Sequence, residues 1–289
     1  MILVLALTAI PAAAPARKWG RPRTVFQVTT TSIPESSGIA PSRTRPGSFY
    51  THNDSGDTSR FFRINLNGRE PSRNPFETFG LANVTARDWE DMATARIGSN
   101  NYIYIGDIGD NSLNRTSAII YRVVEPTANS GSLSIFDRIT ITYPFGSQNC
   151  ECLMVHPTSG DIWIVNKVSS GASNIFRLAA PTGTGTYSMS FMGTVHVGGQ
   201  DQISERVTGG AFSPDGKWVV LRTRYAAYEF AVPANANQWF TSTPTPIVLA
   251  NEAQGEAICY SLKSSGLYTT SEGSPFTVNL VPTIETATR

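Results

Sequence analysis

Short runs of alternating apolar and polar residues follow one another along almost the whole chain, and Gly, Pro, Asn or Asp separates them. Alternation with a period of two is typical of β-strands that bury one face. No run with the period of a helix is long enough to shape the fold. The pattern therefore predicts an all-β protein built from many short strands.

These strands recur as a unit with a period of roughly 40 to 60 residues, as expected of repeat architectures. The clearest copy begins at Glu90, passes through a first strand and a turn, and ends its second strand at Asp107. A third strand follows in every copy, and a fourth is expected in the first four copies. The expected second strands are 49–54, 102–107, 162–167, 218–223 and 267–272, and the expected fourth strands are 76–81, 138–143, 190–197 and 246–249.

The last copy has no room for a fourth strand, because the chain stops at Arg289. An apolar segment near the other end, Val25–Thr30, has no unit of its own. An N-terminal strand that completes the last unit closes a ring and removes an exposed edge. The sequence thus predicts a five-bladed β-propeller with four-stranded blades, closed by an N-terminal strand in the last blade, and a single domain over residues 24–289.

Residues 1–16 read as a secretory signal peptide: an apolar run precedes a Pro- and Ala-rich stretch, although no basic residue opens it. The run is too short to span a bilayer. Residues 17–23 are expected to be a linker. We expect a secreted, extracellular protein that is a monomer and has no membrane partner.

A net charge of +1 and the absence of a basic run argue against nucleic acid as a partner. Three cysteines, Cys150, Cys152 and Cys259, are too few for a disulfide scaffold. We expect buried strand residues at these positions and leave open a bridge from Cys150 or Cys152 to Cys259. No cysteine or histidine spacing indicates zinc.

Propeller topology predicts which side chains share one mouth of the ring. The segment that leads into the first strand and the loop after the second strand lie at the same end, and the first strand is innermost. Aligning the copies gives two positions per blade that converge on this mouth. The first holds Ser37, Glu90, Glu151, Gly209 and Glu256, and the second holds Asn53, Asp107, Asn166, Thr223 and Ser271.

Three glutamates around a narrow axis repel one another unless protons or a cation lie between them. Carboxylate and amide oxygens suit Ca²⁺, which takes oxygen ligands. We therefore predict Ca²⁺ as cofactor. The expected ligands are Glu90, Glu151 and Glu256 with Asn53, Asp107 and Asn166. The alternative is that these polar side chains cap turns around a water-filled channel.

Side chains with catalytic potential lie near the same mouth. His52 or Asp107 could accept a proton, and Lys167 and Arg222 could neutralise a developing oxyanion. A packed histidine and a solvated arginine are the alternatives. The sequence has no G-x-S-x-G, H-E-x-x-H or Walker motif, so metal-assisted hydrolysis is the reaction class that keeps support. Further out lie Asp54, Asp110 and Glu272, as supporting groups or plain turn residues.

Four phrases carry a family resemblance: THNDSGD at 51–57, DWED at 88–91, YIGDIGDN at 104–111 and VTGGAFSPDG at 207–216. The chain resembles a family of secreted bacterial β-propeller proteins without an established activity, which implies the fold and no reaction. More loosely, the layout with central carboxylates is similar to the five-bladed calcium-activated apyrases, which hydrolyse nucleoside di- and triphosphates. Calcium-dependent lactonases are six-bladed, and the fivefold repeat does not match them.

Together the observations predict a secreted calcium-binding propeller that hydrolyses a small anionic substrate, a phosphate ester or anhydride, at the axial mouth. The alternative function is a non-catalytic module that binds a glycan or protein there. Both functions rest on analogy between folds, so the chemistry of the mouth has to decide between them.

Overall fold

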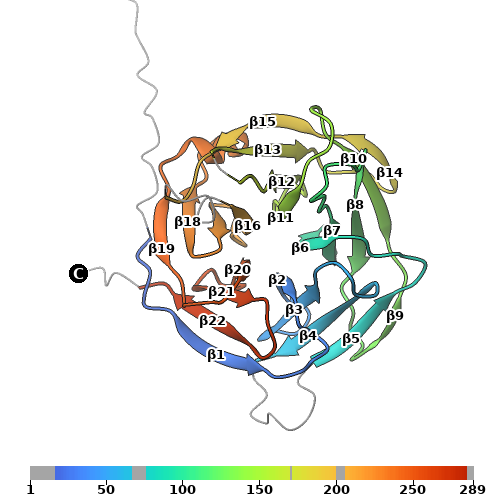
Figure 1. The fold of residues 1–289 in the computed structure, drawn as a ribbon, viewed down its shortest axis with the longest axis horizontal. Helices are drawn as coiled ribbons and strands as arrows, with labels where there is room; N and C mark the ends of the chain where they lie inside the picture. The colour runs from blue at the N-terminus through green and yellow to red at the C-terminus, as the bar shows by residue number, and fades with distance from the viewer. Residues whose placement is uncertain (1–16, 67–75, 170, 200–205, 285–289) are drawn as a thin grey trace, which may run out of the picture.

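The computed structural model describes residues 17–66, 76–169, 171–199 and 206–284. Within them, five mainly antiparallel sheets surround a central axis (Figure 1). The predicted five-bladed propeller is therefore confirmed. Residues 1–16, the expected signal peptide, lie outside the described residues. Among those that are described, no helix is long and apolar enough to cross a membrane.

Each blade starts with its innermost strand and proceeds outward. Blade 1 contains β2(Ser36–Pro41), β3(Ser48–Asn53), β4(Arg60–Asn65) and β5(Phe76–Leu81), and blade 2 contains β6(Trp89–Ile97), β7(Asn100–Asp107), β8(Ala118–Val124) and β10(Asp137–Thr142). Blade 3 contains β11(Cys150–Val155), β12(Ile162–Asn166), β13(Ser173–Leu178) and β15(Ser190–Val195). Blade 4 contains β16(Val207–Phe212), β17(Trp218–Thr223), β18(Ala226–Ala231) and β19(Thr245–Val248).

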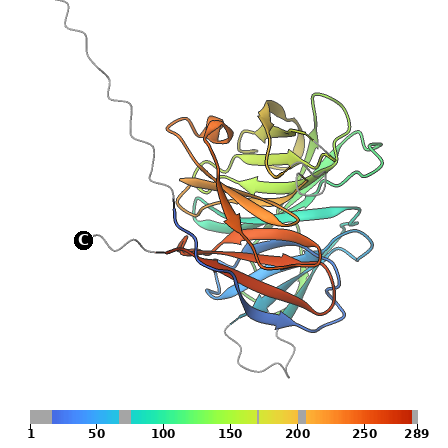
Figure 2. The same cartoon turned by 60° about the vertical axis from the view of Figure 1, so that its left-hand side comes forward.

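Blade 5 joins the two ends of the chain. Its strands β20(Gly255–Tyr260), β21(Gly266–Ser271) and β22(Phe276–Pro282) are completed by β1(Arg23–Val28), which pairs antiparallel with β22. Figure 2 shows β1 alongside the C-terminal strands. The closing strand begins and ends two residues before the predicted Val25–Thr30. Its last pair joins Val28 to Phe276.

Two blades carry a fifth, parallel strand that the sequence did not predict. β9(Gly131–Leu133) pairs with β5 of blade 1, and β14(Gly185–Ser188) pairs with β10 of blade 2 (Figure 1). The 3-10 helix η1(Ala236–Thr241) packs against β15 of blade 3 in the same way. All three come from the connection between the third and fourth strands of the following blade. They cover outer strands that would otherwise be open edges.

The hydrophobic core lies between neighbouring blades. Trp163 of blade 3, for example, packs against Phe212 of blade 4 at a ring-centroid distance of 6.3 Å and against Trp239 of η1 at 6.2 Å. The alternation seen in the sequence buries such side chains on the two faces of each blade. The three cysteines are free and buried, as expected of small strand residues.

Charge on the buried face of β1 is expected to open the ring. Val28 is 1% exposed, whereas the side chain of its neighbour Gln27 is exposed. Val28→Asp should lower the free energy of unfolding by about 3 kcal/mol or more, because it loses apolar burial and buries a carboxylate. Gln27→Asp, the matched control, should change it by about 0.5 kcal/mol or less. Equal denaturation midpoints for both variants would contradict the closing role of β1.

Candidate functional site

Every innermost strand has a β-bulge near its start, at the mouth of the axis. In each blade the register with the second strand shifts around one residue. A bulge re-aims the side chain of the extra residue. The bulged residues are Ser37, Glu90, Glu151, Thr208 and Glu256.

Blade 4 corrects the sequence alignment by one residue, because Thr208 and not Gly209 occupies the bulge. The two hydroxyl residues of this set bind backbone. Ser37 Oγ donates to Glu90 O at 2.5 Å, and Thr208 Oγ1 donates to Gly255 O at 3.2 Å. Each therefore links its blade to the next. The glutamates supply the charge of the mouth.

Lys167 supplies a positive charge among the three glutamates. Its Nζ lies 2.5 Å from Glu151 Oε1. Burial alone lowers the pKa of Lys167, but the charges of Glu151, Glu256 and Glu90 outweigh burial and raise it. The ammonium group of Lys167 thus supplies part of the positive charge that the sequence analysis assigned to a bound cation.

The glutamates remain under strong mutual repulsion despite this lysine. Burial, followed by repulsion from Glu151, raises the pKa of Glu90 well above its usual range. Burial raises the pKa of Glu151 to about 8, against the opposing effect of Lys167. Burial also raises the pKa of Glu256. The mouth therefore carries more carboxylates than its own cation can neutralise, which favours proton uptake or a further cation.

A second group of carboxylates converges at the rim of the mouth. One oxygen each from Asp54, Asp88 and Glu90 lies within 4.8 Å of the others. A calcium ion at about 2.3–2.6 Å from its ligands touches oxygens that far apart. Within the described residues, the carboxylates of Asp88 and Glu90 accept no hydrogen bond. The donor chemistry thus suits a metal ion, and two of the candidate ligands, Asp54 and Asp88, are absent from the predicted set.

Gly109 leaves the space that this carboxylate group occupies. A Cβ atom at this position would lie 2.2 Å from Glu90 Oε1 and 2.5 Å from Asp88 Oδ2. Arg115 holds the loop in place, since its Nη1 donates to Gly109 O at 2.7 Å. A larger residue here would displace these two carboxylates, so the glycine matters through close approach and not through its backbone angles.

Asp107, predicted as ligand and base, uses its carboxylate to hold the same loops. Its Oδ1 forms an ion pair with Arg115 Nη2 at 2.8 Å, and its two oxygens accept hydrogen bonds from the backbone N–H groups of Arg87 and Asp88. These contacts hold the segments that present Asp88 and Gly109. The structure thus places Asp107 behind the rim carboxylates.

The two asparagines of the predicted ligand set bind within their own blades. Asn53 Nδ2 donates to Asp57 Oδ2 at 2.6 Å, and Asn53 Oδ1 accepts from Glu35 N at 3.2 Å. Asn166 Oδ1 accepts from Asn174 N at 2.6 Å, and its Nδ2 donates to Gln148 Oε1 at 2.9 Å. Both asparagines shape loops at the mouth and use their oxygens in doing so.

His52 lies in the interior, 0% exposed, with Nδ1 2.8 Å from Asn53 O. Burial lowers the pKa of His52 to about 4, so the ring is neutral at physiological pH. It packs edge to face against Trp89 at a ring-centroid distance of 5.7 Å. The structure thus brings the predicted base into the core, out of contact with solvent.

Asp91 is an interior carboxylate that the sequence analysis did not single out. It is 0% exposed, and its Oδ1 accepts from Met92 N at 2.8 Å while its Oδ2 accepts from Leu153 N at 2.9 Å. Burial raises its pKa well above the usual range. Its contact with Leu153 joins the innermost strands of blades 2 and 3. Asp91 directly follows Glu90, and Leu153 lies two residues after Glu151.

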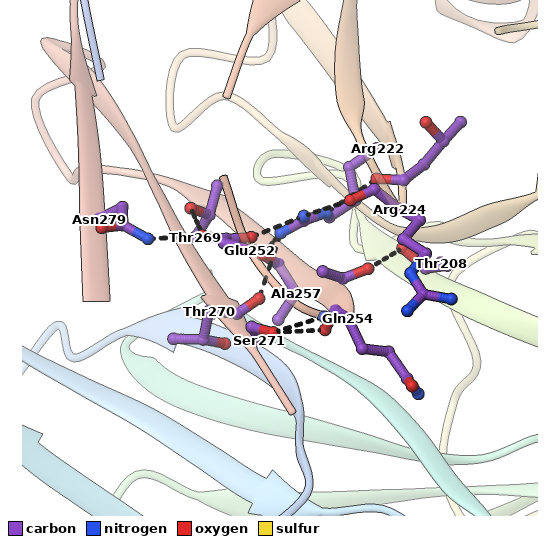
Figure 3. Close-up of polar contacts among 12 residues, drawn as sticks. Thr208, Arg222, Arg224, Glu252, Gln254, Ala257, Thr269, Thr270, Ser271 and Asn279 are labelled. Carbon is purple, nitrogen blue, oxygen red and sulfur yellow. Dashed lines mark hydrogen bonds and ion pairs between the residues drawn. The ribbon is translucent and has the colours of Figure 1, made fainter. Parts of the chain in front are cut away.

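Arg222, predicted to clamp an anion, joins blades 4 and 5 (Figure 3). Its Nη2 lies 2.7 Å from Glu252 Oε2, and its Nη1 donates to Ala257 O at 2.8 Å. Glu252 Oε1 accepts from Thr269 Oγ1 and Asn279 Nδ2 at 2.6 and 2.7 Å. Arg222 is 0% exposed, so the structure places its guanidinium out of reach of a substrate at the mouth.

Comparisons with known proteins do not identify a family for this chain. No family model matches the chain, and no curated protein matches it. Among solved structures, a gluconolactonase from Xanthomonas campestris is similar over 96% of this chain and 99% of its own, with 11% sequence identity and a TM-score of 0.44. A likeness of this degree says nothing about the reaction. The class defined by fold and site is a five-bladed propeller with an acidic axial mouth.

Without added cation, the free energy of unfolding should fall as the pH rises through the pKa values of the carboxyl groups at the mouth. Glu151 and Glu272 have pKa values raised, chiefly by burial, to about 8 and about 7. Because the folded state holds these protons more tightly than the unfolded state, their contribution is full at low pH and is lost through the folded pKa values. We expect a loss of about 2 kcal/mol between pH 6.5 and 8.5.

Glu151→Gln should flatten this pH dependence, and denaturant titrations at several pH values would measure it. His52 titrates lower, and its lowered pKa of about 4 affects stability below this window. A stability that rises from pH 6.5 to 8.5 in the wild type would contradict the raised values.

Proposed function

We propose that the protein is a secreted calcium-binding β-propeller that hydrolyses a phosphate ester at its axial mouth. The observation that carries the proposal is the rim group of Asp54, Asp88 and Glu90. One oxygen of each lies within 4.8 Å of the others, next to the ion pair of half-buried Lys167 with buried Glu151. An oxygen-only donor set of this kind suits a hard cation. The Pro- and Ala-rich N-terminal segment supports secretion.

Asp54, Asp88 and Glu90 would hold the cation at the rim of the mouth. A bound Ca²⁺ would supply Lewis acidity and orient a phosphoryl oxygen. The cation would also relieve the repulsion that raises the pKa of Glu90. Gly109 keeps the space between the carboxylates open and thereby fixes their separation.

The residues of the axis supply the remaining chemistry. Lys167 is held 2.5 Å from Glu151 and presents a positive charge toward an oxyanion that develops in the reaction. Burial raises the pKa of Glu151 to about 8, so Glu151 would take up a proton from water in the molecules in which it is ionised, and their share grows as the pH rises toward 8. Lys167 thus keeps the role that the sequence gave to it together with Arg222, and Glu151 takes the role that the sequence gave to His52 or Asp107. The contacts of Arg222, His52 and Asp107 lie within the scaffold.

Cation binding is expected to depend on the rim carboxylates and on Gly109. Glu90→Gln removes a ligand charge, and Gly109→Ala places a methyl group where Glu90 Oε1 and Asp88 Oδ2 now lie. Each should weaken Ca²⁺ binding about tenfold or more, a loss of about 1.4 kcal/mol. Isothermal titration calorimetry measures this directly.

Glu77→Gln is the matched control, because Glu77 lies on β5 and pairs with Arg63 on β4, away from the rim group. Its affinity for Ca²⁺ should equal that of the wild type. A wild type that shows no heat of binding and no calcium-dependent rise in melting temperature would overturn the cation site.

Hydrolysis should require calcium together with the axial pair. We expect turnover of p-nitrophenyl phosphate or a nucleoside diphosphate with Ca²⁺, and loss of about 10²-fold or more in kcat for Glu151→Gln and Lys167→Met. Full activity in chelator would contradict the role of the cation. Calcium binding without turnover of any phosphate ester would instead identify a binding module that uses the same mouth.

A further inference from the structure

A polar groove crosses blade 1 on the face that carries the mouth. It consists of two adjoining shallow hollows of about 370 and 530 Å³ that share Asp57 and Arg60. Hydroxyl groups are frequent in its lining. They belong to Thr31, Ser32, Ser55, Thr58, Ser59, Thr78 and Thr85.

The groove begins where the rim carboxylates end. Asn53 and Ser55 line it, while Asp54 between them belongs to the rim group with Asp88 and Glu90. A molecule with one end at the mouth would therefore extend over the loop between β3 and β4 into the groove. The same short loop presents both surfaces.

Arg60 is fixed in this groove with donors to spare. Its Nε donates to Asp57 Oδ1 and Oδ2 at 3.0 and 2.9 Å, and its guanidinium lies 5.2 Å from the ring centre of Phe62. Its two terminal nitrogens make no hydrogen bond within the described residues. A guanidinium whose position is already set loses little conformational entropy when it binds a ligand.

Asp57 supplies the complementary acceptor. Although burial alone raises its pKa, hydrogen bonds from Arg60, Asn53 and Thr58 outweigh burial and lower it, so the carboxylate is ionised. The carboxylate can accept from one hydroxyl of a diol, while the guanidinium beside it donates to the neighbouring hydroxyl. The pair thus matches adjacent hydroxyl groups on a ring.

Charge in the groove disfavours a free anion. Asp57 and Glu35 both line the first hollow, and Arg60 is the cation that lines it. An uncharged molecule with many hydroxyl groups meets no such repulsion. Leu81 and Val84 add apolar surface in the second hollow for the C–H face of a sugar ring.

Ser59 keeps the far wall in place before any ligand arrives. Its Oγ donates to Val84 O at 2.6 Å and accepts from Ala86 N at 2.9 Å. The wall therefore needs no ordering when a ligand binds, which reduces the cost of association.

We propose that this groove binds a neutral saccharide unit and that the substrate of the mouth is a phosphate ester of a saccharide. The second part rests on the proposed hydrolase function. In the reaction the oxygen of water bonds to phosphorus, the bond between phosphorus and the sugar oxygen breaks, and that oxygen takes a proton to leave as an alcohol. The saccharide groove itself needs neither cation nor reaction.

Sugar binding can be measured on metal-stripped, isotope-labelled protein by NMR, with glucose, galactose, mannose and inorganic phosphate as separate probes. We expect saturable shifts of the Ser55 and Thr58 amides and of the Arg60 Nε–H with at least one sugar, at a Kd of about 1 to 10 mM, typical of a small polar ligand. Arg60→Gln should weaken this binding at least tenfold, as read from the two amides.

Arg177→Gln is the matched control, because Arg177 pairs with Asp161 through Nε and Nη2 as a comparable half-buried pair on blade 3. It should leave sugar binding unchanged. The absence of shifts with every sugar, or shifts with phosphate alone, would overturn the saccharide groove. Sugar binding without esterase activity would leave the groove intact and overturn the hydrolase, so the two failures are distinguishable.

Discussion

The whole structure depends on closing the ring, because an open propeller would leave one sheet without its last strand. Pairing of β1 with β22 provides the backbone part of this closure. A polar chain that runs from exposed Thr24 into the interior provides the rest: Thr24 Oγ1 donates to Asn279, Asn279 donates to Glu252, and Glu252 pairs with Arg222. Since Glu252 lies just before the strand that carries Glu256, the contacts that fix the closing strand also fix one side of the mouth.

The mouth combines a fixed positive charge with an excess of negative charge. Lys167 neutralises part of the axial glutamates, and the surplus extends to the rim, where Asp54 and Asp88 join Glu90. Paired groups with perturbed pKa values are common at functional sites, and here the cause is burial together with mutual repulsion. Buried, hydrogen-bonded carboxylates such as Asp91 and Asp107 hold the segments that carry this surplus charge at fixed spacing.

Much of the architecture could be predicted from the sequence, because alternation and repetition record burial residue by residue. The details of the site could not be predicted in the same way. A bulge shifts the register by one residue, so Thr208 replaced Gly209 without any local signal. The partners of Arg222 and Asp107 lie on other segments, and only the folded chain shows that their charges are already paired. Strands as short as β9 and β14 leave no readable pattern.

The covering strands also impose an order in time. The outer strand of blade 1 is covered only after residues 131–133 have been synthesised, and that of blade 2 only after residues 185–188. Each of these two sheets is therefore completed by a segment that is made after its blade. The last blade reverses this rule, because its missing strand, β1, is made before the other strands of the ring. During synthesis this strand must stay unpaired until β22 appears. The earliest-made strand of the ring is therefore the last to find its partner.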